Sequence, residues 1–161
     1  MFEHLDNCEY LELMEISETY QQCLTIVVAE ATTGDEITSV SKEEEPLEEV
    51  RDLLSGSRSI EIRDSSEVFQ ISFEDYIAYG VSNESYAGGK FKEEYKGKYA
   101  RVYRTSAFLN FIEQGTFATS DYPGPFKHYA ICCLNQIIDV VSVEPPKVVN
   151  KCLTSFQSSL R

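Results

Sequence analysis

The segment "KHYAICCLNQIIDVVSV", residues 127–143, decides the fold because two apolar stretches meet in it at Asn135 and Gln136. Both stretches are rich in residues that favour strands, and asparagine tolerates the left-handed conformation of a tight turn. The segment therefore predicts a β-hairpin of residues 127–134 and 137–144. Glutamine is a poor second turn residue, so a longer loop is the alternative.

Reactive-looking side chains in this hairpin are expected to lie too far apart for joint chemistry. With a two-residue loop, Cys132 lies opposite Asp139, and His128 lies on the same face, whereas Cys133 points to the other face. His128 and Cys132 are then roughly 13 Å apart along one strand, but a nucleophile and its base must approach within about 3 Å. We expect no Cys–His dyad and no metal shared by the two thiols. Both cysteines are interpreted as small buried residues.

Asp139 is a carboxylate flanked by two Ile and two Val residues, where an unpaired charge is costly. The structural alternative is a hydrogen bond to a tyrosine hydroxyl or a pairing with Arg101 or Arg104. The functional alternative is acid–base work in a pocket that also contains Tyr79, Tyr103 and His128. At the start of its strand, His128 is expected at the rim of the sheet rather than as a base.

The remaining pattern predicts more strands than helices. Phe69, Ile71 and Phe73 alternate with polar residues as in a half-buried strand, and residues 58–86 are interpreted as a β-meander. Further strands are expected over 8–16, 23–31, 37–41 and 98–104, and helices over 45–56, 105–115 and 148–160. The middle helix is expected to bury Phe108, Leu109, Phe111 and Ile112. The prediction is one α+β domain, residues 1–161, with a mainly antiparallel β-sheet (meander and hairpins) and two or three helices packed on it.

The negative charge is concentrated in the first third of the chain. Of the 27 Asp and Glu residues, 14 lie in residues 1–50, where Lys42 is the only Lys or Arg, and the net charge of the chain is −13. Such a region attracts a basic partner and repels nucleic acid or an anionic membrane. The candidate partner-binding residues are Glu43, Glu44, Glu45, Glu48 and Glu49. Because this run also begins the helix expected over 45–56, a purely structural role is the alternative.

Residues 90–104 form the basic counterpart, with six Lys or Arg, two Glu and four aromatic residues. Basic and aromatic residues together bind single-stranded nucleic acid in many proteins. The acidic third of the same chain would oppose that binding, so we do not expect a nucleic-acid partner. A strand edge or the C-terminal helix could instead build a homodimer.

The sequence lacks the motifs that would identify a cofactor or a common catalytic centre. No G-x-S-x-G, P-loop, H-E-x-x-H or G-x-G-x-x-G occurs, so no cofactor or metal is expected. No apolar run is long enough for a membrane span, and the acidic N-terminus does not resemble a signal peptide. Five cysteines in no framework spacing indicate free thiols and a cytoplasmic protein.

Two functional hypotheses follow. The first is a non-enzymatic acidic interaction module, for example of the inhibitor or immunity type, that binds a basic protein through its N-terminal third. The second is a small-molecule-binding or catalytic pocket in the β-sheet that uses Asp139, His128, Tyr79 and Tyr103. The first is preferred, so that binding is expected rather than catalysis.

Overall fold

The computed structural model describes residues 2–36 and 57–152, and within these residues antiparallel strands predominate. The strands are β1 (Tyr10–Glu18), β2 (Leu24–Glu36), β3 (Arg58–Glu61), β4 (Glu67–Phe73), β5 (Tyr76–Asn83), β6 (Glu94–Lys96), β7 (Ala100–Thr105), β8 (Lys127–Cys132), β9 (Gln136–Ser142) and β10 (Lys147–Cys152). The helices are α1 (Glu3–Asn7), the short 3₁₀ helix η1 (Glu84–Tyr86) and α3 (Ala107–Gly115). The prediction of a mainly antiparallel β-sheet with few helices is confirmed.

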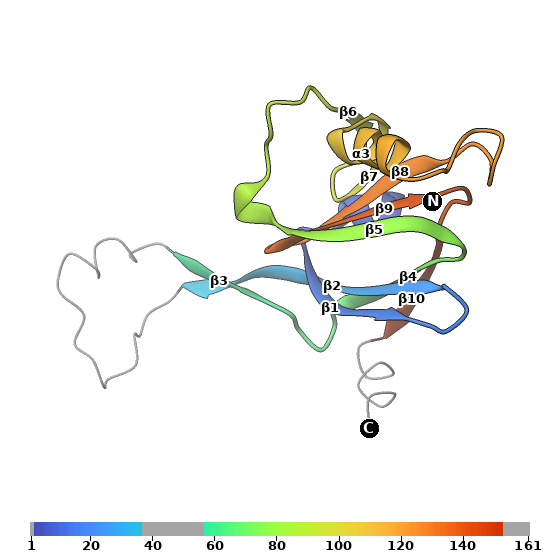
Figure 1. The fold of residues 1–161 in the computed structure, drawn as a ribbon. Helices are drawn as coiled ribbons and strands as arrows, with labels where there is room; N and C mark the ends of the chain where they lie inside the picture. The colour runs from blue at the N-terminus through green and yellow to red at the C-terminus, as the bar shows by residue number, and fades with distance from the viewer. Residues whose placement is uncertain (1, 37–56, 153–161) are drawn as a thin grey trace.

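The strands form two sheets of five that pack face to face (Figure 1). The first sheet has the order β1-β2-β4-β10, with β3 paired to β2, and the second has the order β5-β9-β8-β7-β6. Alternation along the strands directs large apolar side chains of both sheets into one core. The first sheet contributes Leu24, Ile26, Val28, Phe69, Ile71 and Phe73, and the second contributes Tyr129, Ile131, Ile138 and Val140. α3 lies over the outer face of the second sheet (Figure 1).

Residues 58–86 contain three strands, β3, β4 and β5, but these do not form the predicted meander. β3 and β4 both pair with β2, whereas β5 pairs with β9 in the other sheet. The chain changes sheets at the bend between β4 and β5, where Asp75 has a φ of 53°. Aspartate is one of the few residues that adopt this left-handed conformation readily. β4 and β5, although consecutive in the chain, therefore lie in different sheets.

The hairpin of β8 and β9 is confirmed, with a register that differs by two residues from the prediction. Ala130, rather than Cys132, lies opposite Asp139. The loop spans residues 133–135 because Leu134 is held by β1: its N–H donates to the carbonyl of Leu11 at 2.8 Å. The longer loop that Gln136 suggested is the one observed.

A register difference of two residues leaves each side chain on its predicted face. His128 and Asp139 lie on the outer face of the second sheet, under α3, whereas Cys133 belongs to the core between the sheets. Cys132 is 7 % exposed and Cys133 5 % exposed, so both cysteines are buried as predicted.

Two of the predicted helices need correction, and one lies outside the described residues. Lys147–Cys152, the start of the helix expected over 148–160, is instead strand β10, paired with β4. α3, which has Ser106 as its N-cap, lies where the middle helix is expected, but Phe111 is 67 % exposed and Ile112 is the buried residue of the helix. The helix expected over 45–56, and the return strand at 37–41, lie outside the described residues.

The N-terminus forms the helix α1, which was not predicted. Leu5 of α1 is fully buried in the core. Oδ1 of Asp6 accepts hydrogen bonds from the backbone N–H groups of Lys98, Tyr99 and Ala100 at 3.0, 2.8 and 3.0 Å. α1 is thus fastened to the start of β7 on the second sheet.

Candidate ligand-binding cleft

The outer face of the second sheet carries a row of residues from four strands. Arg101 of β7, Ala130 of β8, Asp139 of β9 and Gly80 of β5 are successive partners across the sheet. In the next row, Tyr103 pairs with His128. A Cβ at Gly80 would lie 3.4 Å from the ring of Phe108, so the missing side chain leaves room for that ring beside Asp139. α3 therefore approaches the sheet closely at this row.

A chain of hydrogen bonds links α3 to Asp139 through His128. Oγ of Ser106 lies 2.7 Å from Nδ1 of His128, and Nε2 of His128 lies 2.9 Å from Oδ1 of Asp139. The same Oγ accepts the N–H of Leu109 at 2.9 Å, as an N-cap does. A neutral imidazole with its proton on Nε2 satisfies every group, because Ser106 then donates to Nδ1 and Nε2 donates to the carboxylate.

His128 is a buried member of this chain and not the rim residue that its position suggested. It is 1 % exposed and Ser106 is 2 % exposed. The imidazole stacks on Tyr103, with ring centroids 4.2 Å apart and planes 16° apart, and Phe108 packs beside it at 5.3 Å. The partner of Asp139 is therefore His128, not the tyrosine hydroxyl, Arg101 or Arg104 that the sequence suggested. The side chain of Asp139 is 21 % exposed and reaches solvent through a cavity.

This cavity, which we call the Asp139 cleft, has a volume of about 420 Å³. Its floor is the outer face of the second sheet, and its walls are the N-terminus of α3, η1 and the segment leading to β6. Five aromatic residues line it: Tyr86, Phe91, Tyr95, Tyr103 and Phe108. The polar lining consists of Ser82, Asn83, Glu93, Arg101, His128 and Asp139. Aromatic walls with a few convergent polar groups are typical of a small-molecule site.

Arg101 supplies the positive charge of the cleft. Its guanidinium lies over the ring of Tyr95 at 4.4 Å, and its Nε donates to the carbonyl of Lys98 at 3.2 Å. Burial alone would lower the pKa of Arg101, but its interactions with Tyr103, Cys132 and Tyr95 raise the pKa overall. The side chain is thus a fixed cation. Glu93 is also fixed, because it accepts the N–H of Ala107 at 3.1 Å at the start of α3.

Three of the four residues predicted for a pocket meet in the Asp139 cleft, namely Tyr103, His128 and Asp139. Tyr79 does not line it and packs edge-on against Tyr76 with ring centroids 5.3 Å apart. Ser106, the N-cap of α3, is not among the residues that the sequence predicted for the pocket. The alternation of "KYARVYR" places Arg101 and Tyr103 on one face, and this signal could have joined Arg101 to the pocket.

Among the described residues, no cysteine lines the Asp139 cleft. Burial raises the pKa of Cys132 to about 11 and that of Cys133 to about 12. Burial likewise raises the pKa of Cys8 to about 11. A thiol must lose its proton to act as a nucleophile or metal ligand, so these three are inert near neutral pH. Cys8, Cys23, Cys132 and Cys133 are all free thiols.

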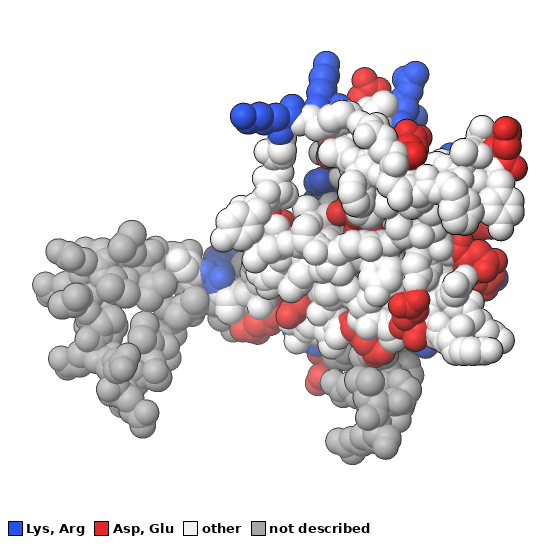
Figure 2. Space-filling model, viewed as in Figure 1, with Lys and Arg blue, Asp and Glu red and all other residues white. Residues whose placement is uncertain are grey.

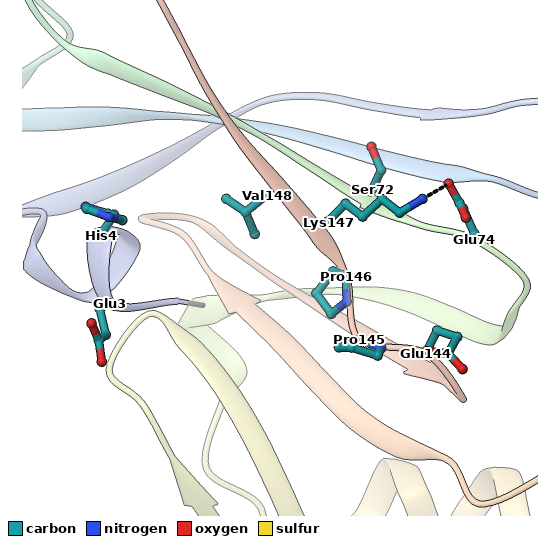
Figure 3. A pocket seen from close by; sticks show the side chains of 9 residues that line it. All are labelled: Glu3, His4, Ser72, Glu74, Glu144, Pro145, Pro146, Lys147 and Val148. Carbon is teal, nitrogen blue, oxygen red and sulfur yellow. Dashed lines mark hydrogen bonds and ion pairs between the residues drawn. The ribbon is translucent and has the colours of Figure 1, made fainter.

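A second and larger cavity, of about 720 Å³, lies between α1 and the start of β10 (Figure 3). Its lining includes the charged residues Glu3, Glu74, Glu144 and Lys147. Lys147 pairs with Glu74 at 2.6 Å, but the two side chains are 69 % and 58 % exposed. Exposed pairs of this kind hold their geometry weakly. The smaller Asp139 cleft, with its buried support, is therefore the better candidate site.

Other sequence-based candidates can be placed only in part. Glu43, Glu44, Glu45, Glu48 and Glu49 lie outside the described residues. Within residues 2–36 and 57–152, no three His, Cys, Asp or Glu side chains are grouped as metal ligands would be. None of the helices described here combines the length and the apolar character that crossing a membrane requires.

Comparisons with known proteins give no independent assignment. No protein-family model, no curated protein and no solved structure matches this chain. The function must therefore be inferred from the geometry of the site.

Proposed function

We propose that this protein binds a small polar organic molecule in the Asp139 cleft. The observation that carries the proposal is the position of the Asp139 carboxylate. It faces the cleft and is hydrogen-bonded to His128, which is itself hydrogen-bonded to Ser106. A group held by buried neighbours is preorganised, so little conformational entropy is lost when it meets a ligand. The volume of about 420 Å³ lies within the range of ligand sites in proteins.

Binding fits this geometry better than serine-based catalysis. A nucleophilic serine must expose its Oγ to the substrate, but Ser106 is 2 % exposed and its Oγ already accepts the N–H of Leu109. Of the three hydrogen-bonded residues Ser106, His128 and Asp139, Asp139 is the most exposed, and its carboxylate faces the cleft. The hydrogen bonds therefore position a carboxylate for a ligand rather than activate a hydroxyl.

Asp139→Asn is expected to weaken the binding of a cleft ligand by at least about tenfold, because a hydrogen bond to a charged group contributes about 1.5–3 kcal/mol. The amide oxygen can still accept the Nε2–H of His128, so the fold is retained. Ligands come from a screen of small polar molecules observed by protein NMR, and their affinities are measured by titration.

The matched control is Asp121→Asn, which changes an exposed aspartate in the loop after α3. This variant should bind like the unchanged protein. Equal affinities for the unchanged protein and Asp139→Asn would count against the proposal, as would ligands whose NMR shifts map away from the cleft.

A second candidate function is the binding of a basic protein by the acidic part of the chain. Residues 2–36 contain nine Asp or Glu and no Lys or Arg. Among the described side chains, no Lys or Arg nitrogen lies within 4.0 Å of the seven carboxylates between Glu3 and Glu30. Glu12 and Glu15 lie on β1, which is an edge strand. In Figure 2, carboxylates are visible over the lower sheet, while several basic side chains extend from the top of the molecule.

This second function predicts an interaction that depends on salt and on β1. A basic partner is to be isolated by affinity capture, identified by mass spectrometry and titrated against the pure protein at increasing salt. Replacing Glu12 and Glu15 together by Gln should weaken the binding and flatten its dependence on salt. An affinity unchanged by salt and by this double replacement would exclude electrostatic docking at β1.

A further inference from the structure

Three charged side chains in the Asp139 cleft lack a charged partner of their own. Asp139 and Glu93 are negative and Arg101 is positive. Among the described residues, no Lys or Arg nitrogen lies within 4.0 Å of either carboxylate, and no carboxylate oxygen lies that near Arg101. His128, the hydrogen-bond partner of Asp139, satisfies its neighbours as a neutral ring. Charges held in a partly closed space favour a ligand that brings the opposite charges.

The two principal charges lie at different places on the floor of the cleft. Arg101 and Asp139 are partners of the same residue, Ala130, on the strand between them. Two strand spacings separate their Cα atoms, which amounts to about 10 Å. Arg101 is drawn further towards β6 by its stacking on Tyr95. A ligand lying across β8 would therefore meet a positive group at one end and a negative group at the other.

Glu93 is a weaker anchor than Asp139. One of its oxygens accepts the N–H of Ala107, at the positive end of the dipole of α3. Part of its charge is thereby offset within the protein. Asp139 lies at no helix N-terminus, and among the described residues its side chain has the ring of His128 as its one hydrogen-bond partner.

Between the charges, the walls are aromatic. Tyr86 and Phe91 come from the segment before β6, and Phe108 comes from α3. Aromatic faces bind flat apolar groups and also attract ammonium ions. The wall therefore complements a ring carried by the ligand.

We infer that the ligand of the Asp139 cleft is a zwitterion, in which an ammonium group binds Asp139, a carboxylate binds Arg101, and a flat apolar part packs among the aromatic side chains. This inference rests on the proposed ligand-binding function and specifies its ligand class. A simple amine would leave Arg101 without a partner, and a simple acid would leave Asp139 without one.

The test compares three probes that share one ring, namely 4-(aminomethyl)phenylacetate, 4-ethylbenzylamine and 4-methylphenylacetate. The first has an ammonium group and a carboxylate on opposite sides of the ring, and each of the others keeps one of the two charges. Affinities for the full chain are measured at pH 7 by calorimetry or NMR titration. 4-(Aminomethyl)phenylacetate should bind at least about tenfold more tightly than either of the other two, because it alone satisfies both charges. Similar affinities for all three probes, or no binding of any of them, would overturn the inference.

Two variants assign each charge to its residue. In Arg101→Gln, 4-(aminomethyl)phenylacetate should lose its advantage over 4-ethylbenzylamine, and in Asp139→Asn it should lose its advantage over 4-methylphenylacetate. Arg104→Gln is the matched control, since this arginine lies on the same strand but is 86 % exposed and pairs with Glu94. It should keep both advantages. Loss of both advantages in Arg104→Gln would also contradict the assignment.

The neutral analogue 4-ethylbenzyl alcohol separates the inference from the function on which it rests. If this alcohol binds more tightly than 4-(aminomethyl)phenylacetate, and if its binding still depends on Asp139, the cleft is a ligand site but not one for zwitterions. If the screen of polar molecules finds no cleft ligand at all, the proposed function itself fails.

Discussion

Asp6→Ala is expected to lower the free energy of unfolding by about 3 kcal/mol, because three backbone donors lose one acceptor. Oδ1 of Asp6 accepts the N–H groups of Lys98, Tyr99 and Ala100 within 3.0 Å. An unsatisfied buried donor costs about 1–3 kcal/mol, and those nearest the surface recover part of this cost from water. Urea denaturation followed by circular dichroism measures the change.

The turn that presents these donors has a conformation suited to a carboxylate. Gly97 has a φ of 101°, and a Cβ there would lie 2.2 Å from the carbonyl oxygen of Ala100. Glycine is the residue that adopts this conformation without strain. Successive N–H groups then converge on one point, as in anion-binding turns of other proteins. Without the carboxylate, α1 loses its attachment to β7, and the buried Leu5 loses its support.

Glu3→Ala is the control for this prediction, because Glu3 is an exposed acidic residue on the same helix. Its replacement should change the stability by no more than about 0.5 kcal/mol. If both replacements lower the free energy of unfolding by the same amount, Asp6 acts only as a negative charge in the first turn of α1. A large effect of Asp6→Ala alone would identify the three hydrogen bonds as the cause.

The sequence predicts the inner and outer faces of the strands well, because that information is local. Ile71 and Phe73 alternate with polar neighbours, and both are buried in the core. The alternation does not say which strand pairs with which, so β4 and β5 were expected in one meander although they lie in different sheets. Pairing depends on contacts between residues far apart in the chain, which a local pattern does not contain.

The incorrect helix at the C-terminus has a similar cause. The spacing of Val148, Val149 and Cys152 fits a helix face, but Val148 and Val149 are also β-branched, which favours a strand. A free edge of β4 is available to Lys147–Cys152, and six residue pairs form there. Tertiary pairing therefore outweighs the helical pattern.

The candidate site depended on the register of one hairpin. In the predicted register, Asp139 faces Cys132, roughly 13 Å along the strand from His128. In the observed register, Asp139 faces Ala130 and lies diagonally beside His128. A diagonal pair is within reach of an imidazole and a carboxylate. A register shift of two residues thus separates a hairpin with scattered polar groups from a hydrogen-bonded site.

His128→Leu is expected to lower the free energy of unfolding by about 3 kcal/mol, since a buried side chain loses two hydrogen bonds. Ser106 would lose the acceptor of its hydroxyl proton, and Asp139 would lose its donor. The stacking on Tyr103 would also change. Because Ser106 caps α3, amide hydrogen exchange in residues 109–115 should accelerate. The control His4→Leu, at an exposed histidine, should leave the exchange of α3 unchanged.

Combining this replacement with Asp139→Asn distinguishes a hydrogen-bonded pair from two independent residues. After His128→Leu, a partly buried carboxylate remains without its donor, whereas an amide in the same place carries no charge to be desolvated. We therefore expect His128→Leu to cost about 1 kcal/mol less in the Asp139→Asn protein than in the unchanged one. Costs that agree within about 0.3 kcal/mol would show that the two residues do not act together. In that case His128 would fill space under α3, and the orientation of Asp139 towards the cleft would need another cause.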